Sequence, residues 1–176
     1  MTDAIQSIED KVATLGLQNP FWNITYKGAR ITSRQPKRET DIHPTIHGLL
    51  FDVALAKNLE IVPEYPVAGG RLDFLMSGVL KTGKIVSVCV EFKLAHSGSD
   101  LLHGLLKQLP AYMQAKGSDY GIYCVMFFKG QYFDQPVEYD KSSLQFLLHK
   151  ERIVAGHTNI RELILDFSYT KPPSGL

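Results

Sequence analysis

The feature that most constrains the fold is a pair of neighbouring β-type segments that carry charged residues within otherwise apolar runs. RLDFLM spans residues 71–76 and IVSVCVEFK spans 85–93, with KTGK as a turn between them, so the two segments predict an antiparallel hairpin. Alternate residues of a strand share one face. Asp73 of the first strand is therefore expected on the same polar face as Glu91 and Lys93 of the second.

Two carboxylates brought together in such a place need a compensating charge. An ionised carboxylate in a buried strand is costly, and two that repel raise one pKa unless a cation lies between them. A hard divalent cation such as Mg²⁺ takes oxygen ligands and keeps waters that can react. Lys93 would then orient or deprotonate a water and offset the charge on an attacked phosphate.

A structural alternative is open for each of these residues taken alone. Glu91 and Lys93 can form a plain ion pair, and Asp73 can cap the Gly-Gly turn at 69–70 or pair with Arg71. The combination favours the metal site, because the acid, the turn, the Glu-x-Lys strand and a following helix all occur in one order.

The remaining patterns predict an α/β chain. Helical spacing of apolar residues predicts helices at 2–17, about 43–58, 100–117 and about 141–151. Runs rich in β-formers predict strands at 60–67, 71–76, 85–93, 120–130 and 160–169. Pro63 and Pro66 restrict the first strand to a sheet edge, and the apolar run at 120–130 predicts a central strand covered on both faces. Pro110 predicts a kink in its helix.

Composition limits the class of protein. The chain of 176 residues is 44% hydrophobic and 21% charged, which suits a globular protein with a real core. Cys89 and Cys124 lie in apolar runs without the spacing of a zinc site, which predicts reduced core thiols. There is no signal-peptide pattern, and no apolar run reaches the roughly 18 to 20 residues that span a bilayer. We therefore expect a cytoplasmic protein without membrane contact.

A basic segment precedes the main part of the chain. Because the net charge is only +1, a polyanionic partner has to be met by a local patch. The segment KGARITSRQPKR at 27–38 has no acidic residue, and its five basic residues are Lys27, Arg30, Arg34, Lys37 and Arg38. It is either a solvated loop or an arm that contacts nucleic-acid phosphates.

We expect three regions along the chain. Residues 1–40 comprise a helix and the basic segment, packed on the core or extending from it. Residues 41–170 form the main domain, and 171–176 form a disordered tail. The sequence contains no internal repeat and no low-complexity tract.

Three short motifs resemble a known enzyme superfamily. The Leu-Asp at 72–73, the Glu-Phe-Lys at 91–93 and the KQLPAYM at 107–113 resemble the PD-(D/E)XK nucleases, which include restriction endonucleases and Holliday-junction resolvases. The resemblance covers about 43–128. It implies a restriction-endonuclease-like core in the order α-β-β-β-α-β, with a mixed sheet of four to five strands flanked by helices.

The resemblance also implies a role for each matching residue. Asp73 and Glu91 would bind Mg²⁺, with Mn²⁺ as a substitute, and Lys93 would be the catalytic base or the cation that orients water. Gln108 and Tyr112 match the Q-x-x-x-Y element of the RecB-like branch. Their spacing puts them on one helix face, within reach of Lys93 or the nucleic-acid backbone.

Two positions depart from the pattern. Leu72 stands where the superfamily name has proline, which is a frequent variation. Many members also carry an acidic residue on the first helix, which here offers His43, His47 and Asp52. We predict Glu64, on the following strand, as the additional metal ligand or water-holder, with His47 as the next candidate and His43 as a structural residue.

The function predicted from these residues is hydrolysis of phosphodiester bonds in DNA by a metal-dependent nuclease. RNA is an alternative substrate, and a homodimer is an open alternative to a monomer. The competing prediction is a catalytically inactive module of the nuclease fold that binds DNA or assembles with other proteins, because fold does not fix function. The sequence does not distinguish an endonuclease from an exonuclease.

Overall fold

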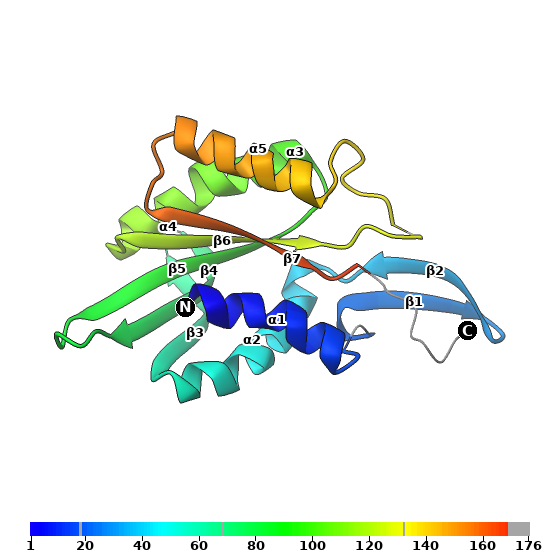
Figure 1. The fold of residues 1–176 in the computed structure, drawn as a ribbon, viewed down its shortest axis with the longest axis horizontal. Helices are drawn as coiled ribbons and strands as arrows, with labels where there is room; N and C mark the ends of the chain where they lie inside the picture. The colour runs from blue at the N-terminus through cyan, green and yellow to red at the C-terminus, as the bar shows by residue number, and fades with distance from the viewer. Residues whose placement is uncertain (18, 68, 132, 169–176) are drawn as a thin grey trace.

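The computed structural model describes residues 1–17, 19–67, 69–131 and 133–168. It contains a mixed five-stranded sheet with helices on both faces and, at one end, a two-stranded sheet that we call the β1–β2 arm (Figure 1). The predicted α/β class with a mixed sheet is therefore confirmed. The tail predicted at 171–176 lies outside the described residues. Within the described ranges, no helix is both long and apolar enough to cross a membrane.

The order of the elements explains why the sheet is mixed. The helices are α1 (Thr2–Thr14), α2 (Glu39–Ala56), α3 (Gly98–His103), α4 (Leu109–Lys116) and α5 (Lys141–Val154), with a 3₁₀ turn η1 (Asn19–Phe21) and a π-helical turn η2 (Gly104–Gln108). The strands are β1 (Trp22–Lys27), β2 (Arg30–Pro36), β3 (Leu59–Val67), β4 (Gly70–Val79), β5 (Ile85–Leu94), β6 (Tyr120–Phe127) and β7 (Ile160–Asp166). The large sheet has the order β3-β4-β5-β6-β7, antiparallel from β3 to β5 and parallel from β5 to β7. Both parallel connections cross over through helices, as parallel strands require.

The strands occupy the places that their sequences predict. β3, which contains Pro63 and Pro66, lies at an edge of the large sheet, where a missing N–H is tolerated. β4 and β5 form the predicted hairpin. β6 is buried at all positions except Tyr120 and pairs on both sides, as expected for a central strand.

Two apolar clusters cover the two faces of the large sheet. On one face α1 and α2 pack against the strands through residues such as Ile5, Ile46 and Phe74 (Figure 1). On the other face the helices α3 to α5 pack through residues such as Leu105 and Leu148 (Figure 1). Because both faces are covered, charged side chains on β4 and β5 are tolerated only near strand ends.

Helix α1 has the predicted amphipathic stripe but ends early. Ile5, Ile8 and Val12 are buried as predicted. The helix ends at Thr14 instead of continuing to 17, so Leu15, which the stripe includes, is 64% exposed. Since α1 contributes to the same cluster as α2, it belongs to the core.

Helix α2 begins four residues earlier than predicted. The sequence placed the start near 43 because proline is favoured in a first turn, which would make Pro44 an initial residue. Instead the helix starts at Glu39, and Pro44 lies inside it. Glu39 and Asp41 carry negative charge in the first turn, which interacts favourably with the positive end of the helix dipole.

The segment predicted as one kinked helix over 100–117 consists of three pieces. α3 leads into the π-helical turn η2, and α4 follows with Pro110 near its start. Pro110 has no N–H to donate to the preceding turn, and the wider η2 turn lies directly before it. The irregularity predicted at Pro110 is present and falls just before that residue.

The basic segment forms a hairpin rather than the loop considered from its sequence. β1 pairs antiparallel with β2 up to Lys27↔Arg30, and Gly28 takes a positive φ of 61° in the turn. Glycine adopts this conformation at little cost, as two-residue hairpin turns require. At the base of the arm, the Trp22 indole donates to the carbonyl of Phe167 at 3.1 Å. The arm is thereby fixed to the end of the main sheet.

Candidate active site

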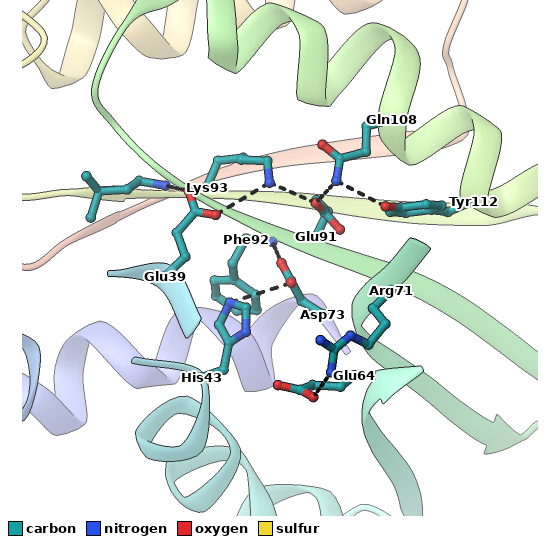
Figure 2. A network of polar contacts seen from close by, with 11 residues as sticks. Glu39, His43, Glu64, Arg71, Asp73, Glu91, Phe92, Lys93, Gln108 and Tyr112 are labelled. Atoms are coloured by element: carbon teal, nitrogen blue, oxygen red, sulfur yellow. Dashed lines mark hydrogen bonds and ion pairs between the residues drawn. The ribbon is translucent and has the colours of Figure 1, made fainter. Parts of the chain in front are cut away.

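The charged residues of β4 and β5 meet where the ladder between these strands ends (Figure 2). The last backbone pair of the ladder is Phe74↔Val90. Two residues further along β5, Phe92 donates its backbone N–H to Asp73 Oδ2 at 2.6 Å instead of to a carbonyl of β4. The Asp73 side chain thus ends the ladder beside Glu91, as the hairpin predicts.

Glu91 is the most deeply buried charged residue of the site, with 1% exposure. Its Oε1 accepts a hydrogen bond from Gln108 Nε2 at 2.6 Å and lies 3.0 Å from Lys93 Nζ. Its Oε2 is buried and has no hydrogen-bond partner among the described residues. A carboxylate oxygen left in this state is costly unless a further group binds it.

The two carboxyl groups have strongly raised pKa values. Burial raises the pKa of Asp73 to about 7, against the lowering effects of the Phe92 N–H and the Lys93 charge. Burial, followed by the charge of Asp73, raises the pKa of Glu91 to about 8, although Lys93 opposes the shift. Two neighbouring carboxyls with such pKa values are typical of functional sites, because a fold gains no stability from them.

Lys93 bridges two acidic residues and remains protonated. Its Nζ lies 3.0 Å from Glu91 Oε1 and 3.5 Å from Glu39 Oε2. Burial alone would lower the pKa of Lys93, but the charges of Glu91 and Glu39 outweigh burial and hold it above the usual value. At neutral pH the residue is therefore a cation and not a proton acceptor.

Glu39 is a site residue that the sequence prediction missed. Besides its contact with Lys93, its Oε1 accepts the backbone N–H of Leu94 at 2.7 Å. Glu39 therefore joins the start of α2 to the end of β5 (Figure 2). The sequence does show an acidic residue directly after the basic segment, at the start of a helix. Because the helix was predicted to start near 43, Glu39 fell outside it.

His43 was interpreted as structural, yet it lies beside the site. Its buried Nε2 is 3.6 Å from Asp73 Oδ1, too far for a hydrogen bond, and has no hydrogen-bond partner among the described residues. Burial lowers the pKa of His43, so the ring is neutral near pH 7. A neutral imidazole beside a carboxylate can hold a water or complete a ligand set.

The two residues predicted as additional ligands, Glu64 and His47, contact Arg71 and Phe74 respectively. Glu64 is half-exposed, and its Oε2 accepts a hydrogen bond from Arg71 at 2.6 Å. The His47 ring lies parallel to Phe74, with centroids 6.3 Å apart. Together with His43, both line a separate cavity of about 310 Å³. Glu64 still raises the pKa of Asp73 through its charge.

Gln108 and Tyr112 are brought to the site, but to Glu91 rather than to Lys93. Gln108 ends η2 and donates to Glu91, and its Nε2 also lies 3.3 Å from Tyr112 Oη. Tyr112 reaches this position across Gly70, where a Cβ atom would come within 2.8 Å of Tyr112 Oη. Tyr112 supports Gln108, and Gln108 fixes the orientation of the Glu91 carboxylate.

The residues present suit a magnesium ion better than a transition metal. Within the part of the chain that is described, no three His, Cys, Asp or Glu side chains form a group ready to bind a metal. Mg²⁺ needs less, because it is usually held by one or two carboxylates and keeps several waters. Asp73 and the unpartnered Oε2 of Glu91 supply two such carboxylates, so the site fits Mg²⁺.

Comparison with known proteins identifies a family but no activity. Residues 1–130 match a family described as a domain of unknown function (DUF8371). No curated protein and no solved structure matches the chain. The matched residues run from α1 through β6, so they include the β1–β2 arm and every residue of the site.

Proposed function

The chain belongs to the family described as a domain of unknown function (DUF8371), and from its site we propose that it is a Mg²⁺-dependent deoxyribonuclease. The large sheet would be a restriction-endonuclease-like core. Asp73 and Glu91 would bind the metal, with Mn²⁺ as a substitute, while Lys93 orients the water that attacks a DNA phosphate. Attack forms a bond from the water oxygen to phosphorus and breaks a phosphodiester P–O bond; the attacking water releases a proton to solvent, and the leaving sugar oxygen takes one up from solvent.

One observation carries this proposal. The half-buried Asp73 and the buried Glu91 are neighbouring carboxyls with pKa values near 7 and 8, and one oxygen of Glu91 has no hydrogen-bond partner among the described residues. A structural ion pair would need one carboxylate for Lys93, not a second that destabilises the first. Paired carboxyls with raised pKa values are instead what a divalent cation compensates.

Each side chain of the site has a separate role in this proposal. A bound Mg²⁺ would supply a water of lowered pKa and neutralise charge on the phosphate. Glu39 and Glu91 hold the Lys93 ammonium between them, so its charge faces the reacting phosphate as negative charge develops. Gln108 holds Oε1 of Glu91 and leaves Oε2 for the metal. Because the pKa of Lys93 is raised, its role is to orient water rather than to remove a proton.

The β1–β2 arm supplies the charge that a DNA substrate needs. Lys27 and Arg30 are exposed at the tip of the arm, and Lys37 is half-exposed at its base. Of the other two predicted cations, Arg34 is 5% exposed, and Arg38 donates two hydrogen bonds to Asp41. We therefore assign phosphate contact to the first three residues and a structural role to Arg34.

The proposal is tested with the whole chain on four DNA substrates: linear duplex, closed circle, single strand and branched duplex. Each is incubated with Mg²⁺ and with EDTA. We expect Mg²⁺-dependent cleavage by the parent protein and by Glu60→Gln, which changes an exposed carboxylate at the other end of β3. Glu91→Gln should be inactive. Absence of cleavage of all four substrates by a folded parent protein would reject the nuclease and favour the inactive binding module.

A further inference from the structure

One face of the β1–β2 arm carries four uncharged hydrogen-bonding side chains. Cross-strand partners share a face of a two-stranded sheet, and here the pairs are Asn23↔Gln35 and Thr25↔Ser33. Asn23, Thr25 and Gln35 are exposed, and Ser33 is half-buried. These side chains offer both donors and acceptors.

The opposite face of the arm is largely buried near its base, where it is turned toward the protein. Trp22 is 4% exposed, and Ile24 pairs with the buried Arg34. The Trp22 ring packs edge-on against Phe128, with centroids 5.2 Å apart. The polar face is therefore the outward face of an element with a fixed base.

The charges around the polar face are all positive. Residues 19–38 contain no Asp or Glu. Lys27 and Arg30 are cross-strand partners at the tip, and Lys37 follows β2 at the base. A neutral hydrogen-bonding surface with cations at its two ends is complementary to a nucleic acid, which presents both negatively charged phosphates and the polar edges of its bases.

The arm is held in a constant position relative to the candidate active site. Lys37 donates its backbone N–H to the Phe21 carbonyl at 2.9 Å, and the Phe21 ring stacks on Phe167 at 4.5 Å. Glu39 of the site follows Lys37 by two residues in the chain. The base of the arm therefore adjoins the element that carries Glu39.

The dimensions of the arm suit the major groove of duplex DNA. Two paired strands are about 5 Å apart, and the groove, about 12 Å wide, admits such a ribbon. At about 3.3 Å per residue, the six residues of β1 span roughly 20 Å, or about six base pairs. The β-bulge between Thr25 and Tyr26 adds right-handed twist to the ribbon.

We propose that the β1–β2 arm enters the major groove of duplex DNA, with Asn23, Thr25, Ser33 and Gln35 facing base edges and Lys27, Arg30 and Lys37 on the flanking phosphates. This inference rests on the proposed nuclease function and adds to it a substrate class, duplex DNA, and a source of sequence preference. Asn and Gln are the side chains that pair with the adenine edge, and Ser and Thr bond to either partner.

Single-stranded nucleic acid fits the arm less well. Binding of single strands relies on several aromatic side chains on which successive bases stack. Within residues 22–38, all of which are described, Tyr26 is the one exposed aromatic residue, at 58%. One stacking residue does not make a platform for a strand, whereas two cross-strand polar pairs do make a reading surface.

The test compares three variants of the full chain on a pool of duplexes with randomised sequence. Asn23→Ala with Gln35→Ala removes the polar face, Lys27→Gln with Arg30→Gln removes the tip charges, and Gln6→Ala changes an exposed amide on α1 as control. Cleavage with Mg²⁺ is followed by sequencing of the cut ends. Binding of duplex and single-stranded DNA is measured in EDTA by fluorescence anisotropy at several salt concentrations.

We expect the polar-face variant to lose at least about fivefold of its base preference, since a bidentate base contact discriminates by that much or more. The tip variant should bind every duplex more weakly, with a salt slope reduced by about 2. A parent with no base preference at its cut sites, or a polar-face variant with unchanged preference, overturns the inference. If no DNA is cut, the nuclease proposal fails on its own. The proposal for the arm is then tested by binding in EDTA: unequal affinities of the parent for different duplexes support it, and equal affinities overturn it.

Discussion

At the scale of single residues, Asp73 and Glu91 make the stability of the protein depend on pH. Their pKa values, about 7 and about 8, lie well above the value near 4 of a carboxyl in an unfolded chain. Between pH 4 and 8 the folded chain therefore binds more protons than the unfolded one. The stability contributed by their protonation is complete below about pH 4 and is lost as pH rises through 7 and 8.

Replacing one of these carboxyls should therefore stabilise the metal-free protein. In EDTA at pH 9 we expect the free energy of unfolding of Glu91→Gln to exceed that of the parent by about 1–3 kcal/mol, because the amide cannot ionise. The variant should therefore unfold at a higher temperature. At pH 5 the difference should shrink. Thermal unfolding of the parent, Glu91→Gln and Glu60→Gln at both pH values measures it. A Glu91→Gln protein that is less stable than the parent at pH 9 would contradict the assigned charges.

Magnesium should reverse this order. A ligand that binds only the folded state stabilises it by about 2.7 kcal/mol at one hundred times its Kd. Mg²⁺ at pH 8 should raise the unfolding temperature of the parent and of Glu60→Gln, but not that of Asp73→Asn or Glu91→Gln. Equal shifts for all four proteins would place the bound metal elsewhere.

At the scale of elements, the local sequence predicted the strands better than the ends of the helices. The β4–β5 hairpin and β6 follow from alternation and from an apolar run, both local signals. The start of α2 depends on distant contacts, because the Glu39 side chain bonds to Leu94. The β1–β2 arm escaped prediction for the same reason, since its apolar residues are few and Trp22 is anchored to Phe167, far along the chain.

The η2–α4 segment acts on Glu91 through Gln108, so truncations there should be milder than changes on β4 and β5. Gln108→Ala should lower kcat about tenfold, because it frees the Glu91 carboxylate to turn, with little change in KM. Tyr112→Phe removes the contact to Gln108 and should cost less. Steady-state cleavage kinetics check both variants. A Gln108→Ala enzyme with full kcat but lower stability would show that this segment contributes only to packing.

At the scale of the whole molecule, residues from β4, β5, α2 and η2 meet at the site (Figure 2). Asp73, Glu91, Lys93 and Gln108 could be predicted because two strands and one helix bring them together in sequence order. Glu64 as a further ligand stays a prediction: its Oε2 accepts a hydrogen bond from Arg71, and its charge acts on Asp73. Because the net charge is only +1, contact with a polyanion depends on a local patch, and we propose the arm as that patch.

Within segment 27–38, Lys27 and Arg30 should therefore behave differently from Arg34. Replacing the exposed Lys27 and Arg30 should weaken DNA binding and flatten its salt dependence without lowering stability. Arg34→Ala should instead lower stability by about 1–3 kcal/mol, because it removes a buried side chain of the arm. Anisotropy titrations and thermal unfolding separate the two effects. An Arg34 variant of normal stability with a reduced salt slope would return Arg34 to the DNA surface.

The central claim is that Asp73 and Glu91 bind the metal and that Lys93 acts on the water. It is tested most directly by the rate of cleavage of one duplex as a function of Mg²⁺ concentration, for the parent, Asp73→Asn, Glu91→Gln and Lys93→Met. We expect Asp73→Asn and Glu91→Gln to lose activity at every Mg²⁺ concentration. Lys93→Met should saturate at a Mg²⁺ concentration near that of the parent, with a rate lower by about 10² to 10³. Cleavage by all three variants at the parent rate would contradict it.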